Sequence, residues 1–188
     1  ETSIKTGLTA AMWSAILYNS FSSTTQNVFA LNGTDRKRIE GSNVYEWGIT
    51  APSVAPTIVA GAGAGLTGDY NAKYTYLRKE GAVVVSESNP SPSGAAAVTL
   101  ANESLSVTWT ASSDTQVTHV RVYRTLTDGS TYYVDQDIAT GTTTVDTTTA
   151  DASLGTAVAT NHDRPPLGSF VAGPNYNGTC FILRNNLL

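Results

Sequence analysis

The chain has little of the chemistry on which most enzymes and metal sites depend. Its 188 residues include one cysteine, Cys180, and two histidines, His119 and His162. An internal disulfide is therefore excluded, and a zinc site built from cysteine and histidine ligands is not expected. Charged residues make up 14% of the chain and the formal net charge is −4, so no broad basic surface is available. This composition argues against duplex DNA binding as the main role.

Long hydrophobic runs are also missing. The longest apolar-leaning stretch, residues 8–17, is too short and too interrupted to cross a membrane, and we expect no membrane partner. No basic segment followed by an apolar one marks a signal peptide at the start. The chain begins at Glu1 without a methionine, so we expect either a processed chain or a piece of a longer one.

Threonine is abundant. The chain contains 28 threonines, and this β-branched residue is favoured on exposed strand faces. Residues 104–109 alternate polar and apolar side chains, as a half-buried strand does. Similar segments recur about every 10 residues between 69 and 160, with turn signals such as Asp128-Gly129 between them. The pattern predicts an all-β protein that contains a β-sandwich.

We expect one folded unit between two hairpin segments. The predicted segments are residues 1–50 (β-hairpins), 51–68 (linker), 69–160 (sandwich) and 161–188 (a further hairpin). In the last segment, strands are expected on either side of a turn at residues 175–178, because Asn-Gly sequences favour tight turns.

The first segment predicts a series of short strands. Residues 27–31, 36–40 and 43–49 are strand-like, and the first two are separated by a turn signal at residues 32–35. Residues 8–21 carry a weak helical stripe without a capping residue, and we assign them to a strand.

The linker prediction rests on composition. Pro52 and Pro56 favour extended backbone, and the glycine–alanine run at residues 60–65 offers little side chain to pack. A glycine-rich run can also cradle phosphate, but no Lys-Ser/Thr pair and no strand-to-helix change follows this one. We therefore interpret the run as a linker.

Three segments follow one another in the order of a known family: residues 104–110 (SLSVTWT), 117–125 (VTHVRVYRT) and 142–147 (TTTVDT). They resemble the Trp-bearing, Val-x-Val-Tyr-Arg and Thr-x-x-Asp strands of the fibronectin type III sandwiches of bacterial and phage proteins. The tyrosine-bearing hairpin at residues 70–88 is similar to the late hairpin of that family, but here it precedes Trp109. The resemblance covers roughly half of the chain. It implies a circularly permuted sandwich, or one inserted into a host domain.

The flanking segments strengthen the insertion interpretation. Residues 28–35 with 38–45 look like a β-propeller blade, and residues 170–172 with 180–186 are similar to a following blade. Propeller-like sheets that carry sandwich insertions resemble tail and neck proteins of tailed phages, particularly the nozzle-type proteins of short-tailed phages. Such a resemblance implies architecture more directly than function.

No catalytic constellation emerges from the sequence. His119 is predicted on a strand and His162 in a loop, and no Gly-x-Ser-x-Gly elbow surrounds a serine. Asp135 and Asp137 lie two residues apart on a predicted strand, where they would share one face and could bind a cation. The alternative is that they are solvated turn acids, because no Asp-x-Asp-x-Asp-Gly loop is present. We expect no enzyme activity, no cofactor, no metal and no small-molecule substrate.

Arg36, Lys37 and Arg38 form the one basic run, and two interpretations are open. On a propeller loop that faces a lumen, these residues could touch passing DNA through nonspecific attraction to phosphate. On an ordinary hairpin, they would form a charged edge that discourages aggregation between sheets.

Four aromatic residues also have two interpretations: Tyr74, Tyr76, Trp109 and Tyr123. They could form a platform on which a sugar stacks. In a sandwich of the expected type, however, Trp109 belongs in the core between the sheets, and Tyr74 and Tyr76 share a face. We favour the core interpretation.

These observations predict a non-enzymatic structural component of a phage virion, in the tail or neck, that assembles in a symmetric ring with the sandwich outward. Its expected partners are copies of itself and other virion proteins, with nonspecific DNA contact as an open alternative. The alternative prediction is an extracellular bacterial adhesion or carbohydrate-binding module. An enzyme fragment remains only if catalytic residues lie in sequence outside these 188 residues.

Overall fold

The protein is an all-β structure. The computed structural model describes residues 5–18, 26–171 and 181–184. Within these ranges every assigned element is a β-strand except the short 3-10 helix η1 (Asp151–Ser153). The all-β prediction is therefore confirmed.

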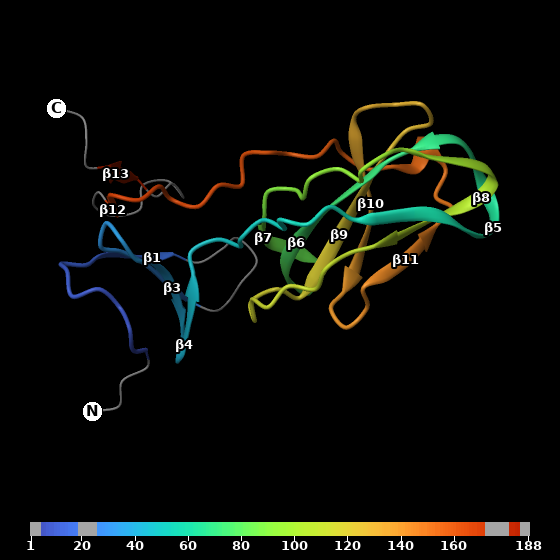
Figure 1. The fold of residues 1–188 in the computed structure, drawn as a ribbon. Coiled ribbons are helices and arrows are strands. Elements are labelled where there is room, and N and C mark those ends of the chain that lie inside the picture. The colour runs from blue at the N-terminus through green and yellow to red at the C-terminus, as the bar shows by residue number, and fades with distance from the viewer. Residues whose placement is uncertain (1–4, 19–25, 172–180, 185–188) are drawn as a thin grey trace. The chain divides into compact units, whose positions relative to one another are not determined.

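The chain forms two compact units. Unit 1 comprises residues 1–48 and 163–188, and unit 2 comprises residues 49–162. Unit 2 is thus inserted in sequence between the two parts of unit 1 (Figure 1).

Unit 1 contains a four-stranded antiparallel sheet, sheet I, with the strand order β1-β2-β3-β4. Its strands are β1 (Ser14–Tyr18), β2 (Asn27–Leu31), β3 (Arg36–Glu40) and β4 (Asn43–Glu46). The strands predicted at residues 27–31 and 36–40 are confirmed, and the one predicted at residues 43–49 is shorter than expected. Within the strand predicted at residues 8–21, β1 begins only at Ser14, and residues 19–21 lie outside the described residues.

A second antiparallel pair completes unit 1. Strand β12 (Ser169–Val171) pairs with β13 (Ile182–Arg184), as predicted for a hairpin near the end of the chain. The predicted turn at residues 175–178 lies outside the described residues.

The β2–β3 turn follows from its sequence. The side-chain Oδ1 of Asn32 accepts hydrogen bonds from the backbone N–H groups of Thr34 (3.0 Å) and Asp35 (2.6 Å). Gly33 adopts a φ of +85°, which favours glycine. Short polar side chains that bond to the nearby backbone are what make such sequences turns.

Unit 2 contains two sheets. Sheet II has the order β10-β9-β6-β7, and sheet III has the order β11-β8-β5. Their strands are β5 (Thr57–Tyr70), β6 (Ala72–Glu80), β7 (Val83–Glu87), β8 (Val98–Thr108), β9 (His119–Thr125), β10 (Tyr132–Ala139) and β11 (Thr144–Thr147).

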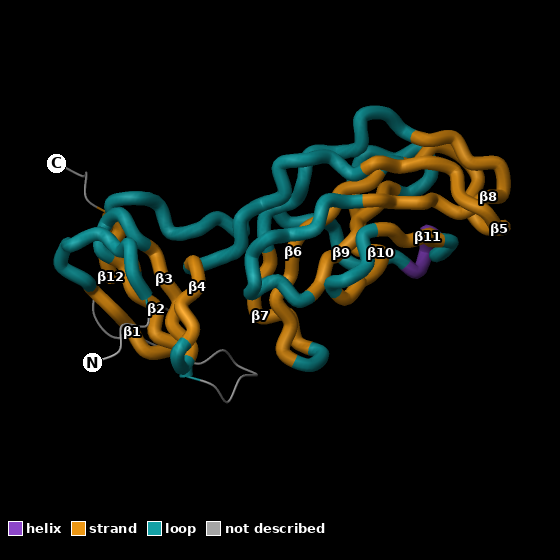
Figure 2. The backbone as a smooth tube through the Cα atoms, turned by 60° about the horizontal axis from the view of Figure 1, so that its bottom comes forward, coloured by secondary structure: helices purple, strands orange, loops and turns teal. Residues whose placement is uncertain are grey.

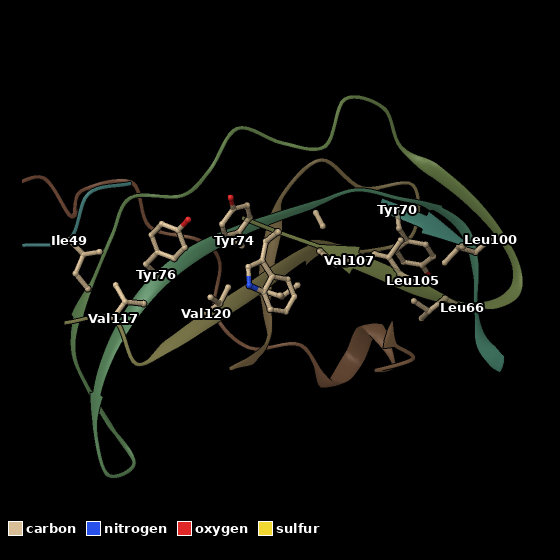
Figure 3. Packing of buried hydrophobic residues seen from close by; sticks show 13 residues of the cluster. Ile49, Leu66, Tyr70, Tyr74, Tyr76, Leu100, Leu105, Val107, Val117 and Val120 are labelled. Carbon is tan, nitrogen blue, oxygen red and sulfur yellow. The ribbon is translucent and has the colours of Figure 1, made fainter. Parts of the chain in front are cut away.

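One cluster of buried hydrophobic side chains joins the two sheets of unit 2. Tyr74, Tyr76 and Val120 from sheet II contribute to the same cluster as Leu105 and Val107 from sheet III (Figure 3). Complete burial of a large apolar side chain contributes about 1.5–3 kcal/mol. Unit 2 therefore has a core of its own, as in a β-sandwich.

The linker prediction for residues 51–68 is wrong over most of its length. Residues 57–70 form β5, one of the two long strands of sheet III that run side by side in Figure 2. Gly61 lies so close to β8 that a Cβ atom there would approach Ser104 Oγ to 2.4 Å. The small residues of this strand allow the neighbouring strand to approach closely. The prediction failed because the same glycine–alanine composition is also typical of linkers.

A glycine pair in β5 yields a first prediction. Gly68 and Gly63 have similar backbone angles, with φ of +108° and +105°. A Cβ atom at Gly68 would meet Thr127 Oγ1 at 2.2 Å, whereas a Cβ atom at Gly63 would have no described atom within 4 Å apart from its chain neighbours. We expect Gly63→Ala to cost about 1–3 kcal/mol through backbone strain, and Gly68→Ala to cost more, because Thr127 must also move.

Urea unfolding of the two variants measures this difference. Thr127 Oγ1 donates a hydrogen bond to the carbonyl of Thr67 at 2.8 Å, and its displacement breaks that bond. Equal losses of stability in the two variants would contradict the assignment of Gly68 to a close contact.

Candidate functional site

The two units differ in how they bury apolar surface. The core cluster lies entirely within unit 2, residues 49–162. Among the described residues of unit 1, the buried hydrophobic side chains are Ile16, Ala30 and Leu31. A single sheet with so few buried side chains has little to stabilise it by itself.

One face of sheet I carries four aliphatic side chains in register. Leu17 lies opposite Val28, Val28 opposite Ile39, and Ile39 opposite Val44, so these residues cross all four strands. We name these four residues the aliphatic row. Leu17 is 59% exposed, and the other three are partly exposed. The described part of the chain therefore leaves this apolar surface partly exposed, most of all at Leu17.

A charged pair borders the aliphatic row. Lys37 and Glu46 face each other on the same side of the sheet, two residues along their strands from Ile39 and Val44. The side chain of Glu46 is 41% exposed and that of Lys37 only 11%. Glu46 is therefore the more exposed member of the pair, and its carboxylate is bonded to the ammonium group of Lys37.

The opposite face of sheet I is aromatic. The ring of Phe29 lies 6.2 Å from that of Tyr18 and 4.8 Å from that of Trp47, measured between centroids. The guanidinium of Arg38 lies 4.6 Å from the centre of the Tyr45 ring. These contacts cover part of this face with its own side chains.

The β12–β13 hairpin adjoins the aromatic side of sheet I. The backbone N–H of Val171 donates a hydrogen bond to Ser14 Oγ at 2.7 Å. Successive side chains of a strand point to opposite faces, so Ser14 lies on the face opposite Leu17. On β13 itself, Ile182 is 37% exposed and Leu183 is 65% exposed. Because these two residues are neighbours on the strand, their side chains point to opposite faces of the hairpin.

Each member of the basic run is engaged within unit 1. Arg36 donates a hydrogen bond to the carbonyl of Pro165 at 2.7 Å, and Lys37 forms its ion pair with Glu46. Arg38 bonds to Asn27 Oδ1 at 2.9 Å and to Glu40 Oε2 at 3.0 Å.

The interpretation of this run as a sheet edge is wrong, because β3 lies between β2 and β4. Lys37 points to the face opposite Arg36 and Arg38, so the three cations do not form one patch. Nonspecific DNA contact by these residues stays a prediction.

Sheet II carries a polar network on the side away from the core. Arg121 holds Asp137 with two hydrogen bonds, of 2.7 and 3.0 Å, and contacts Glu87 at 3.2 Å. Lys79 adds a contact of 2.9 Å to Asp137, and the hydroxyl of Tyr123 donates to Glu87. The network links all four strands of sheet II, and its members satisfy one another.

This network predicts how stability depends on pH. Burial raises the pKa of Asp137, but hydrogen bonds from Arg121 and Lys79 outweigh it, so this pKa lies below its usual value. Burial first, and the bond to Glu87 second, raise the pKa of Tyr123 above that of free tyrosine. Asp137 contributes stability above its unfolded pKa of about 4, and this is lost as pH falls through the lower folded value. Tyr123 contributes stability below about pH 10, which is lost at higher pH.

We therefore expect a plateau of stability between about pH 5 and pH 9, with losses on both sides. Thermal unfolding across the pH range measures it. Asp137→Asn is expected to flatten the acid limb and to leave the alkaline limb in place. An unchanged acid limb in this variant would contradict the role of Asp137.

Asp135 and Asp137 do not share a face, so that prediction is wrong. A β-bulge between Val134 and Gln136 breaks the alternation at Asp135. Asp137 joins the outer network, whereas the side chain of Asp135 is fully buried, with an oxygen 3.8 Å from Arg124 Nε. The prediction of solvated turn acids is also wrong, because both carboxylates lie in β10 and neither is exposed.

Buried Arg124 links strand β9 to the segment that follows β11. It bonds to Asp151 Oδ1 at 2.7 Å and to the carbonyl of Thr149, and it lies 5.1 Å from the centre of the Tyr70 ring. Neither carboxylate oxygen of Asp135 has a hydrogen-bond partner in the described part of the chain. The nearby guanidinium of Arg124 is therefore the group that compensates the buried carboxylate of Asp135.

The four aromatic side chains considered for a sugar-binding platform are buried, three of them in the core and Tyr123 in the polar network. Tyr74, Tyr76 and Trp109 belong to the core cluster, as favoured from the sequence, and Tyr123 is 2% exposed.

The two histidines make local contacts. His119 Nδ1 lies 2.9 Å from Thr118 Oγ1, and the backbone N–H of His162 donates to Asn89 Oδ1 at 2.9 Å.

The described residues contain neither a metal-binding cluster nor a helix that could span a membrane. No group of three or more His, Cys, Asp or Glu side chains there could hold a metal ion. No helix in that part of the chain is long and apolar enough to span a membrane.

Comparisons of the chain with protein-family models, curated proteins and solved structures gave no match.

Sequence reasoning missed the aliphatic row. Its four members come from strands that were predicted separately, but the sequence does not give the register that aligns them. The signal that could have found it is an aliphatic residue at corresponding positions of successive short strands, at Val28, Ile39 and Val44.

Proposed function

We propose that the chain is a non-enzymatic structural subunit that assembles with copies of itself through unit 1. The observation that carries this proposal is the partly exposed aliphatic row of sheet I, in a unit whose described residues bury few hydrophobic side chains. Contiguous apolar surface on a protein exterior is typical of interaction sites. Assembly would bury this surface and add to the few buried hydrophobic side chains among the described residues of unit 1.

The proposed assembly is a symmetric ring in the tail or neck of a phage virion, with other virion proteins as further partners. Support comes from the resemblance of the flanking hairpins to propeller blades. The insertion of unit 2 between the two parts of unit 1 agrees with a host domain that carries a sandwich. Unit 2, with a core of its own, would be the outward domain, and we propose that it is a permuted sandwich of the fibronectin type III type.

The structural role has more support than the alternative role in carbohydrate binding. A sugar platform requires aromatic faces that are open to solvent. The four aromatic residues considered for it are buried: Tyr74, Tyr76, Trp109 and Tyr123. An adhesion module would also leave the apolar surface of unit 1 without a role.

Light scattering on a sizing column tests the proposal. We expect a discrete species whose mass is a multiple of 19.7 kDa, and closed rings in negative-stain electron micrographs of that species. A 19.7 kDa monomer at every concentration would contradict it. Binding of the chain to a glycan array, together with a monomeric mass, would favour the adhesion module instead.

A further inference from the structure

We propose that Asn32, in the turn between β2 and β3, is a site of spontaneous deamidation that is held back by the docking of residues 168–170. We name these three residues the docked segment. The inference goes beyond the proposed function and does not depend on assembly. Asn32 is followed by Gly33, whose backbone nitrogen can reach the side-chain amide without steric hindrance because glycine has no Cβ. The reaction converts a neutral side chain into a carboxylate.

The reaction has two steps and consumes only water. In the first step, the backbone nitrogen of Gly33 loses its proton and forms a bond to Cγ of Asn32. The bond between Cγ and Nδ2 breaks, ammonia leaves, and a cyclic imide remains. In the second step, one water molecule opens this ring at either of its two carbonyls, which leaves an aspartate or an isoaspartate at position 32. No oxidant or reductant is required.

The structure already polarises the side-chain amide of Asn32. Its Oδ1 accepts hydrogen bonds from the backbone N–H groups of Thr34, at 3.0 Å, and Asp35, at 2.6 Å. Two donors on this oxygen stabilise the negative charge that develops there when Cγ is attacked. The nitrogen that leaves, Nδ2, donates a hydrogen bond to Asp35 Oδ2 at 3.0 Å. The electrophile of the reaction is therefore in place in the folded chain.

The docked segment withholds the attacking nitrogen. The backbone N–H of Gly33 donates a hydrogen bond to the carbonyl of Ser169 at 3.2 Å, and that of Gly168 donates to the carbonyl of Gly33 at 2.6 Å. The ring of Phe170 lies against Gly33, because a Cβ atom built there would be 3.1 Å from its Cζ. An N–H group that is bonded and covered in this way reacts only when the segment opens. Deamidation therefore requires the docked segment to leave the turn.

Deamidation would make that opening irreversible. Nδ2 of Asn32 also donates to the carbonyl of Thr9 at 3.2 Å, and a carboxylate at position 32 could donate neither this bond nor the one to Asp35. The pKa of Asp35 lies below its usual value, because the backbone of Thr9 and the side chain of Asn32 donate hydrogen bonds to it. Two charged carboxylates would then repel each other in the turn. The modified turn would record that the docked segment had left it.

Peptide mass spectrometry of the full chain tests whether the fold protects Asn32. Residues 32–34 and 177–179 have the same sequence, Asn-Gly-Thr, so the second site calibrates the first in the same sample. In the urea-denatured chain we expect similar rates of deamidation at the two sites. In the native chain we expect Asn32 to react at least about tenfold more slowly than in the denatured chain. Equal rates at Asn32 in the native and denatured chains would overturn the inference.

Phe170→Ala tests the docked segment. The substitution removes the ring from Gly33, and we expect hydrogen exchange of the Gly33 amide and deamidation of Asn32 both to accelerate at least about tenfold. Leu167→Ala is the matched control, because Leu167 is 59% exposed and directly precedes Gly168. We expect it to change neither rate. Unchanged exchange in Phe170→Ala, or faster exchange without faster deamidation, would overturn the role of the docked segment.

The unchanged chain in urea below its unfolding transition gives the same comparison without a substitution. We expect deamidation of Asn32 to rise in proportion to hydrogen exchange of the Gly33 amide as the docked segment opens. A deamidation rate that does not follow this exchange would contradict the inference.

Asn32→Asp tests whether the modified turn can still hold the docked segment. At neutral pH we expect the Gly33 amide of this variant to exchange at least about tenfold faster than that of the unchanged chain. Exchange as slow as in the unchanged chain would show that deamidation does not prevent docking, and would overturn the irreversible step.

Discussion

Replacement of Arg124 by methionine is expected to destabilise unit 2 by about 3–5 kcal/mol, because it leaves a buried charge without its partner. The side chain of Asp135 is fully buried and lies beside Arg124 Nε, with no hydrogen bond to its oxygens in the described part of the chain. The substitution also removes the bonds from Arg124 to Asp151 and Thr149 in the loop after β11. Urea unfolding measures the loss.

A double variant separates the cost of the unpaired charge from the cost of the other bonds that Arg124 makes. In Arg124→Met with Asp135→Leu, no charge remains alone in the interior, so we expect this chain to be more stable than the single variant. Equal stability of the two chains would show that the bonds from Arg124 to Asp151 and Thr149 account for the loss. A loss below about 1 kcal/mol in Arg124→Met would contradict the proposed role of the buried pair.

Removal of the indole at Trp109 is expected to have an effect of similar size. Trp109 is 5% exposed within the core cluster that joins sheets II and III. Truncation to alanine leaves a cavity that the surrounding structure fills only in part, and such changes cost about 3–5 kcal/mol. The unfolding midpoint of unit 2 in urea measures this cost.

Trp109→Phe is the matched variant. The indole Nε1 is buried without a hydrogen-bond partner among the described residues, so phenylalanine removes an unsatisfied donor while it keeps most of the ring volume. We expect a loss of less than about 2 kcal/mol. If Trp109→Ala and Trp109→Phe lose the same stability, the core position of this residue is not supported.

Many strands of unit 2 could be predicted because polar and apolar residues alternate along them. The alternation at residues 104–109 marks β8, whose Leu105 and Val107 point into the core. Strand β5 was missed because the glycine–alanine run at residues 60–65 in its middle has no β-branched side chain. What makes it a strand is its pairing with β8, a contact between segments distant in sequence.

The candidate site was predicted in part. The basic run at Arg36, Lys37 and Arg38 is visible in the sequence, but its ion pairs depend on neighbouring strands, as in the pair of Lys37 with Glu46. The opposite faces of Asp135 and Asp137 could not be foreseen either, because a bulge changes which face a residue occupies without a fixed sequence signal.

Hydrogen exchange at two protein concentrations tests the central claim most directly, namely that unit 1 is completed by assembly and unit 2 by its own core. Above the concentration of assembly, we expect the amides of β1 to β4 to be strongly protected. On dilution, their protection should fall by about tenfold or more, while that of β6, β8 and β9 stays constant. Protection of β1 to β4 that is independent of concentration would contradict the claim.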